Sequence, residues 1–375
     1  MFLFAWRRFL FLIETKMRFL KKICLLLFAA ANGAFAQSGE TPVLASYSFE
    51  CKAGDSFIAV HPKNQSDFHG EVSDVGANSI SQKTKIWNEN CFAGTHYVLF
   101  SSGSLKGAWF NILSNDSSSV VLNIDSSEIA KINKSDSFRI IAHWTLNSLF
   151  PGGGGLMASE GEVAGVGCSY VFKYSYFDKN GEMQIPEGVN RAVSGVFYYL
   201  KNSGGGRWVM KNGSFDFDAG GEIIEPDSFL ILRNPRDVRL NICGEVFKSA
   251  SVLDFKNPSG EIWQENFFAS PTLTSVKISS FAVLLENGIM NAGSLENPQN
   301  SDFIAVFDNS ESGVNKKPSK IYVYDGGWFR LDSDFKNPVS AGGDILDSKD
   351  AVIFRFSRLA PQTAKRVKIT PDYAE

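Results

Sequence analysis

Long helical periodicity is absent from most of this sequence. Past residue 36, no stretch of eleven or more residues repeats apolar side chains at helical spacing, and the best candidate, 126–134, is barely two turns long. Long apolar runs are missing from the same part, so we expect no transmembrane span in the mature chain. Hydrophobic residues make up 44% and charged residues 21%, as in ordinary globular proteins.

The usual signatures of catalysis are also missing. There is no Gly-x-Ser-x-Gly pentad for a serine hydrolase, no Cys-x-x-Cys pair for redox chemistry and no His-x-x-x-His pair for zinc. The four-glycine tract at 152–155 lacks the following Gly-Lys-Ser or Gly-Lys-Thr of a phosphate-binding loop. We therefore predict no catalytic residue and no cofactor.

Cysteine is scarce, with five in 375 residues. Cys24 lies in the segment that we expect to be removed, which leaves four cysteines that could form disulfides in an oxidising compartment: Cys51, Cys91, Cys168 and Cys243. Four cysteines allow three pairings, and buried free thiols are an equal alternative. Cys91 lies near His96 in sequence, but the pair is a weak basis for thiol catalysis.

The first 36 residues have the pattern of a signal peptide, with translation starting at Met17. Basic residues precede the apolar run 23–31, and the small residues Ala34 and Ala36 suit cleavage before Gln37. An uncleaved anchor is the alternative. Cleavage would remove six basic residues and one acidic residue, so the formal charge would move from -3 to -8. We expect an exported protein, periplasmic, at the cell surface or extracellular, and its acidity argues against nucleic acid as a partner.

Short runs of aromatic and β-branched residues dominate the remaining chain. Clear examples are 170–177, 196–200, 229–232, 320–324 and 352–356, and clusters of Gly, Asn and Asp separate such runs. This pattern predicts an all-β fold of sandwich or small barrel-like modules.

Internal recurrences predict that the modules are arranged in tandem. An Asp-Ser-Phe string starts at Asp55, Asp136 and Asp227, and a Gly-Val-Asn string ends at Asn190 and again at Asn315. Each Gly-Val-Asn string is followed by tyrosines, a tryptophan and a strand bearing an arginine, at 233 and 355. We infer modules at 37–150, 166–255 and 256–375, with a Gly-rich linker or loop at 151–165 and a short basic tail.

These motifs carry a resemblance to a known family. Gly107-Ala108-Trp109-Phe110, His143-Trp144-Thr145-Leu146 and the paired Gly-Val-Asn modules resemble a family of uncharacterised exported bacterial β-repeat proteins of about this length. The resemblance implies export and β-architecture, and it implies no activity. The chain departs from the family pattern near its end, at 347–350.

A few residues are candidates for binding. Calcium could use loop carboxylates, and the weak candidates are Asp178, Asn180, Asp216 and Asp218, although a turn and a strand explain them better. Exposed aromatic rings can stack on sugars, and Trp87 and Trp263 are weak candidates because they lie outside the repeats. We expect Trp109, Trp208 and Trp328 to pack in cores.

The sequence favours a non-catalytic binding, envelope or matrix protein. Its partner would be a polysaccharide or another envelope protein, since export and modular β-structure occur without a catalytic constellation. The alternative is a secreted hydrolase that attacks a polymer with Asp and Glu carboxylates, whose spacing a sequence does not reveal.

Overall fold

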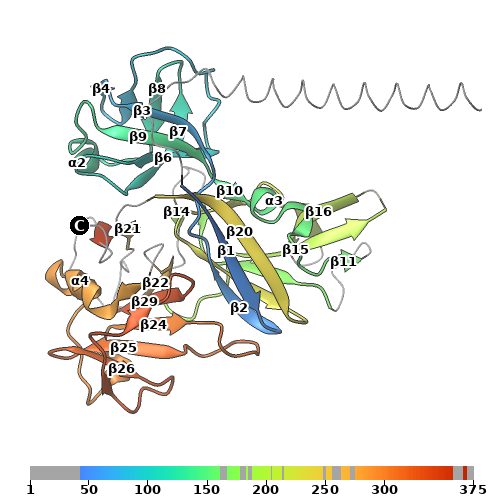
Figure 1. Ribbon diagram of the computed structural model, residues 1–375, viewed down its shortest axis with the longest axis vertical. Helices are drawn as coiled ribbons and strands as arrows, with labels where there is room; N and C mark the ends of the chain where they lie inside the picture. Colours follow the sequence, from blue (N-terminus) through green and yellow to red (C-terminus); the bar gives the residue numbers. More distant parts are fainter. Residues whose placement is uncertain are drawn as a thin grey trace, which may run out of the picture. The chain divides into compact units, whose positions relative to one another are not determined.

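A computed structural model describes residues 43–160, 167–177, 183–184, 188–203, 205–212, 215–247, 251–255, 263–270, 275–357 and 366–369. All of them belong to one compact unit, 42–375. Strands dominate this unit and the helices are single turns, which confirms the all-β prediction (Figure 1). The predicted signal peptide lies outside the described residues. Within the described part, no helix is long and apolar enough to cross a membrane.

The first sheet uses residues between 66 and 142. Its strand order is β3-β9-β6-β7-β8-β5-β4. Apolar side chains such as Phe100, Phe110 and Phe138 fill its core. The helical candidate at 126–134 is a single turn, α2 (Ser126–Ile129), capped by the Asp125 carboxylate. The strands are β3 (Ser66–Glu71), β4 (Asp74–Val75), β5 (Ser79–Ser81), β6 (His96–Phe100), β7 (Trp109–Asn115), β8 (Ser119–Leu122) and β9 (Ser137–Ala142).

The second sheet has the order β17-β16-β15-β12-β19-β2, and β11 pairs with β15. Its strands are β2 (Gly54–Ala59), β11 (Ser159–Glu160), β12 (Tyr170–Lys173), β15 (Gly195–Asn202), β16 (Gly205–Asn212), β17 (Phe215–Asp218) and β19 (Phe229–Asn234). Smaller pairs accompany it: β1 (Val43–Cys51) with β20 (Val238–Val246), β10 (Trp144–Thr145) with β18 (Ile223–Ile224), and β13 (Tyr176–Phe177) with β14 (Met183–Gln184). The turns α3 (Leu146–Leu149) and η1 (Pro151–Gly153) connect β10 to β11.

The third sheet has the order β22-β29-β24-β25-β26-β27. Its strands are β22 (Gln264–Ala269), β24 (Phe303–Phe307), β25 (Lys320–Tyr324), β26 (Trp328–Leu331), β27 (Val339–Ser340) and β29 (Ala351–Phe356). Two smaller pairs accompany it, β21 (Ser251–Asp254) with β30 (Arg366–Ile369) and β23 (Val276–Lys277) with β28 (Ile345–Leu346). Its single-turn helices are η2 (Ile278–Phe281), α4 (Ala282–Glu286) and η3 (Pro298–Asn300).

The central parts of the three sheets share one strand order. β3-β9-β6-β7-β8, β2-β19-β12-β15-β16 and β22-β29-β24-β25-β26 each place the first strand in sequence beside the last. The Asp-Ser-Phe strings at Asp136 and Asp227 lie at the start of this last strand, β9 and β19, whereas the string at Asp55 lies in β2, the first strand of the second sheet. Two of the three strings therefore stand at equivalent positions, one in the first sheet and one in the second.

Strand pairing crosses the predicted module border at residue 150. β1 and β2 precede the first sheet in sequence, yet β2 pairs with β19 and β1 pairs with β20 along nine residues. Phe49 and Ile58 accordingly contribute to the core of the second sheet. The sequence pattern predicts that a strand forms but not which strand it pairs with, because the pairing joins segments more than 150 residues apart.

The glycine tract expected as a linker or loop contains packed residues. Glycines 152–155 all have positive φ, a conformation that costs glycine little. A Cβ on Gly153 would lie 2.8 Å from the Tyr199 ring, so the tract approaches this side chain closely. Leu156 belongs to the core of the second sheet.

Candidate functional site

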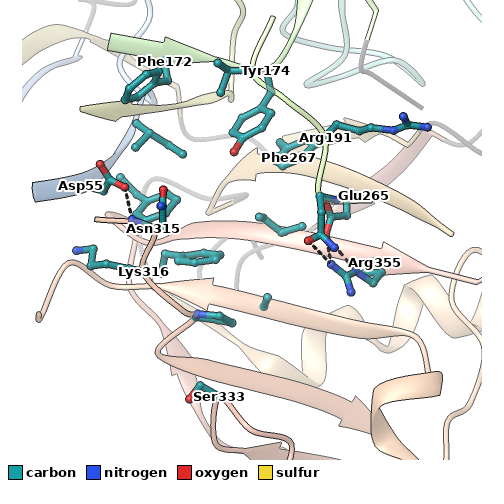
Figure 2. A pocket seen from close by; sticks show the side chains of 18 of the residues that line it. Asp55, Phe172, Tyr174, Arg191, Glu265, Phe267, Asn315, Lys316, Ser333 and Arg355 are labelled. Atoms are coloured by element: carbon teal, nitrogen blue, oxygen red, sulfur yellow. Dashed lines mark hydrogen bonds and ion pairs between the residues drawn. The ribbon is translucent and has the colours of Figure 1, made fainter. Parts of the chain in front are cut away.

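A pocket of about 680 Å³ is lined by side chains of the second and third sheets (Figure 2). Its walls come from β2, β12 and β19 of the second sheet and from β22, β24 and β29 of the third. The volume lies within the usual range for sites that bind small molecules. This pocket is the strongest candidate for a binding site among the described residues.

Aromatic rings form the body of the pocket. Tyr174 stacks on Phe267 with ring centroids 4.3 Å apart, and Phe57 stacks on Phe307 at the same distance. Tyr174 and Phe267 are half-buried, so part of each ring is accessible. Apolar ring faces can pack against the C–H faces of a sugar ring or against another apolar ligand.

The first polar cluster of the pocket is built on Asp55 and Arg233. The Arg233 guanidinium donates from Nε and Nη2 to the two Asp55 carboxylate oxygens, at 2.7 and 2.9 Å. The residues face each other on β2 and β19, and the Arg233 guanidinium lies 5.0 Å from the centroid of the Phe172 ring. This two-point geometry fixes the guanidinium plane.

The second polar cluster repeats this arrangement with Glu265 and Arg355. Arg355 donates to Glu265 Oε1 through Nε at 3.1 Å and also through Nη2. These residues face each other on β22 and β29, and the guanidinium lies 4.9 Å from the centroid of the Phe303 ring. The carboxylate–arginine pair thus occupies the same two strands in the second and third sheets.

The two Gly-Val-Asn strings dock reciprocally on these ion pairs. Asn315 follows the third sheet's β24 and binds the second sheet's pair: its N–H donates to Asp55 Oδ2 at 2.7 Å and its Oδ1 accepts from Arg233 at 3.0 Å. Asn190 follows β14 and binds the opposite pair, donating to Glu265 Oε2 at 2.9 Å and accepting from Arg355 at 3.4 Å. Both asparagines have positive φ, 50° and 51°.

The same exchange extends to the backbone. The Asp55 N–H donates to the Gly313 carbonyl at 2.6 Å, and the Glu265 N–H donates to the Gly188 carbonyl at 3.1 Å. Each loop therefore binds a carboxylate and the N–H of the same residue. The repeated Gly-Val-Asn string therefore has a structural role: each copy forms a loop that binds one carboxylate–arginine pair of the pocket.

No family model, no curated protein and no solved structure matches this chain.

Burial shifts the pKa of two further groups of the pocket. Burial raises the pKa of the Tyr174 phenol, and the nearby Glu265 and Asp55 carboxylates raise it further, so the ring lies near both ion pairs. Burial also lowers the pKa of the Lys316 ammonium, against the opposing effect of Asp55. The Lys316 ammonium lies 6.0 Å from the centroid of the Phe57 ring and donates to the Glu311 carbonyl at 2.8 Å.

The tryptophans that the sequence suggested for ligand binding do not line this pocket. Trp87 is half-buried and makes edge contacts with Phe68 and Phe92 in the first sheet's core, and Trp263 is half-buried just before β22. Of the tryptophans expected in cores, Trp208 and Trp328 are buried and Trp109 is half-buried.

The calcium candidates receive no support from the described carboxylates. Asp178 and Asn180 lie outside the described residues, as does the Asp216 side chain. Asp218 is exposed at the end of β17 and accepts from the Gly220 N–H at 3.3 Å. The described residues contain no group of three or more His, Cys, Asp or Glu side chains arranged to hold a metal ion.

The four cysteines form no disulfide with one another in the structure. Cys51 pairs with Val238 across β1 and β20, whereas Cys243 lies five residues farther along β20. At about 3.4 Å per residue the two Cα atoms are roughly 17 Å apart, too far for a disulfide. Burial raises the pKa of the Cys51 thiol to about 12.

His96 is engaged away from Cys91. Its Nε2 is 2.8 Å from Asp67 Oδ2 and its Nδ1 is 2.7 Å from the Thr95 hydroxyl. The Cys91 sulfur instead accepts from the Asn115 amide at 3.7 Å. The two side chains therefore make separate contacts.

The sequence contained a partial signal for this pocket. The recurrence marked Asn190, Asn315 and the strands of Arg233 and Arg355, but it identified them as repeated structure rather than as a site. No sequence feature pointed to Glu265. It occupies the position in the third sheet that Asp55 occupies in the second, but the two residues differ in side-chain length and in flanking sequence.

Proposed function

We propose that this chain is a non-catalytic binding protein and that its pocket takes a saccharide unit of a polysaccharide. One observation carries the proposal: accessible ring faces and planar polar side chains converge on one concave surface of about 680 Å³. Rings pack against sugar C–H faces, while arginine and asparagine groups can bind hydroxyls. A second envelope protein is less favoured as the partner, because a pocket suits a small unit better than a broad protein face.

The proposal includes export to the periplasm, cell surface or extracellular medium. The basic segment, apolar run and small residues before Gln37 support it, as does the resemblance to exported proteins. Expression in a bacterial host, followed by N-terminal sequencing of the product outside the cytoplasm, tests this part. A mature chain starting at Gln37 is expected, and full-length protein retained in the cytoplasm would contradict it.

Binding can be tested directly with the mature chain on a glycan array, followed by calorimetry on each glycan that binds. Replacing Tyr174 with alanine removes a ring of the pocket and should weaken binding about tenfold or more. Phe217→Ala is the matched control, because this exposed ring on β17 lies outside the pocket and should leave affinity unchanged. Circular dichroism verifies that both variants fold. An array without any binding, or unchanged affinity in Tyr174→Ala, would refute the proposal.

The alternative is a hydrolase, and one observation favours it: Asp55 and Glu265 line the same pocket. Their oxygens, however, already accept hydrogen bonds from an arginine and an asparagine N–H. A nucleophile or general acid must present its oxygen to the substrate. We therefore expect no turnover of a polysaccharide panel, whereas turnover abolished by Asp55→Asn or Glu265→Gln would establish the hydrolase.

A further inference from the structure

The carboxylate and amide oxygens of both polar clusters already accept hydrogen bonds within the protein. Asp55 accepts two bonds from Arg233 and one from the Asn315 N–H, and Glu265 accepts bonds from Arg355 and the Asn190 N–H. The amide oxygens of the two asparagines also accept from these arginines. Each carboxylate thus accepts three hydrogen bonds within the protein, which uses most of its acceptor sites.

Donors, in contrast, remain available. The Nδ2 groups of Asn190 and Asn315 and the Tyr174 hydroxyl make no hydrogen bond to any residue that the structure describes. Lys316 uses one of its three N–H groups, on the Glu311 carbonyl. A ligand that satisfies this pocket must supply acceptors.

The charges of the side chains that line the pocket also favour a ligand with acceptor groups. Asp55 and Glu265 are neutralised by Arg233 and Arg355. Lys316 and Arg191 also line the pocket, and neither forms an ion pair within 4.0 Å among the described residues. The lining therefore carries two more positive than negative charges.

We infer that the pocket selects saccharides bearing a carboxylate, that is, uronic acid units, with Lys316 as the cation that binds the carboxylate. This inference rests on the proposed function and narrows it. A carboxylate supplies two acceptor oxygens and one negative charge, which match the unused donors and the excess positive charge. The sugar ring would pack on the Tyr174 and Phe267 faces, which lie between Asp55 and Arg355 in Figure 2.

Lys316 has a matched control in its neighbour. Lys317 carries the same charge, but it is exposed, pairs with Asp334 at 2.6 Å and does not line the pocket. Lys316→Met and Lys317→Met each remove one charge and keep an unbranched apolar side chain. Any effect of net charge alone on binding should be equal in the two variants.

The experiment measures binding of trigalacturonic acid and of its trimethyl ester, an uncharged trimer of the same ring structure, by calorimetry at low salt. Wild-type protein and Lys317→Met should bind the acid about tenfold or more tightly than the ester, as expected for a charge-assisted contact. Lys316→Met should reduce this preference to about threefold or less, with ester affinity nearly unchanged.

The outcomes separate the two proposals. Equal affinity of wild-type protein for acid and ester would overturn the carboxylate preference and leave saccharide binding intact. Equal loss of preference in both lysine variants would overturn the role of Lys316. Failure to bind either trimer, with binding to another glycan of the array, overturns this inference alone, whereas an empty array overturns the proposed function as well.

Discussion

Asp55 and Glu265 show how single residues create this pocket. Each carboxylate is held by an arginine from the neighbouring strand and by an asparagine N–H from a distant loop. Buried charged groups are costly unless they are paired and hydrogen-bonded, and here both conditions hold. The pairs therefore act as fixed, planar polar ends of an apolar pocket.

Two buried histidines give the protein a predictable response to acid. Burial lowers the pKa of His61 to about 4 and that of His143 to about 3, from an ordinary value of 6.5. In the unfolded chain both rings bind a proton below pH 6.5, whereas the folded protein keeps them neutral. Stability from these groups is therefore present above pH 6.5 and is lost as the pH falls toward 4.

Asp350 opposes this trend. Burial raises the pKa of this carboxyl to about 6, so the folded protein holds its proton where the unfolded chain has lost it. Its contribution to stability decreases as the pH rises from about 4 to 6. Between pH 7 and pH 5, each histidine lowers the free energy of unfolding by about 2 kcal/mol, whereas Asp350 raises it by about 1 kcal/mol. Acidification therefore destabilises the protein.

Urea unfolding at pH 7 and pH 5 checks this balance. We expect the free energy of unfolding to fall by roughly 3 kcal/mol in the wild-type protein, and by less in His61→Gln and in His143→Gln. Asp350→Asn should show a larger fall than the wild-type protein, because its opposing contribution is gone. A wild-type protein with equal stability at the two pH values would contradict the assignment.

At the scale of elements, loops set the geometry of the pocket. The strands carry the arginines and carboxylates, but the loops at 188–190 and 313–315 complete both clusters. Close backbone approach is required where Gly54 meets Gly313, since a Cβ on Gly54 would lie 2.2 Å from the Gly313 oxygen. Gly54 also has a φ of 93°, which disfavours other residues.

Gly54→Ala tests the docking of the loop at 313–315. The positive φ alone should lower the free energy of unfolding by about 1–2 kcal/mol, and the clash with Gly313 should lower it by about 1–3 kcal/mol more. Gly205→Ala is the matched control, since Gly205 has a φ of 122° but no atom within 4 Å of the added Cβ. Thermal unfolding should show a greater loss for Gly54→Ala, and equal losses in the two variants would count against tight docking.

Many of the expected strands appear at the expected positions. 320–324 is β25 with the same bounds, and 229–232 and 352–356 lie within β19 and β29. The expected strand at 170–177 is split into β12 and β13. Local side-chain pattern and turn residues suffice to place short strands, because both signals lie within a few residues of each other.

At the scale of the whole molecule, the second sheet depends on strands from the start of the described chain. β1 and β2 contribute Phe49, Cys51 and Ile58 to its core, and Val60, directly after β2, also belongs to it. The fragment 151–255 lacks these strands, so it should show a disordered circular dichroism spectrum, whereas 43–255 should retain a β-sheet signal. Cooperative unfolding of the isolated fragment 151–255 would show that the sheet does not need them.

The net charge of the chain and the charge of the pocket lining have opposite effects on an acidic glycan. The mature chain that we propose has a formal charge of -8, which repels an acidic glycan at long range. At physiological salt this repulsion is screened beyond about 8 Å, whereas contacts inside a pocket are screened less. A local excess of cations can therefore select an anion on an acidic protein.

The fold class follows from the amino-acid sequence alone, because alternating short strands and turn residues are local features. The sequence also marked the Gly-Val-Asn loops and the arginine strands, because recurrence is visible without coordinates. Three features become apparent only in three dimensions: each loop binds the other sheet's ion pair, β1 and β2 join the second sheet, and Glu265 is the counterpart of Asp55. These contacts join residues between 75 and 260 positions apart, and no local pattern specifies which distant backbone a side chain will meet.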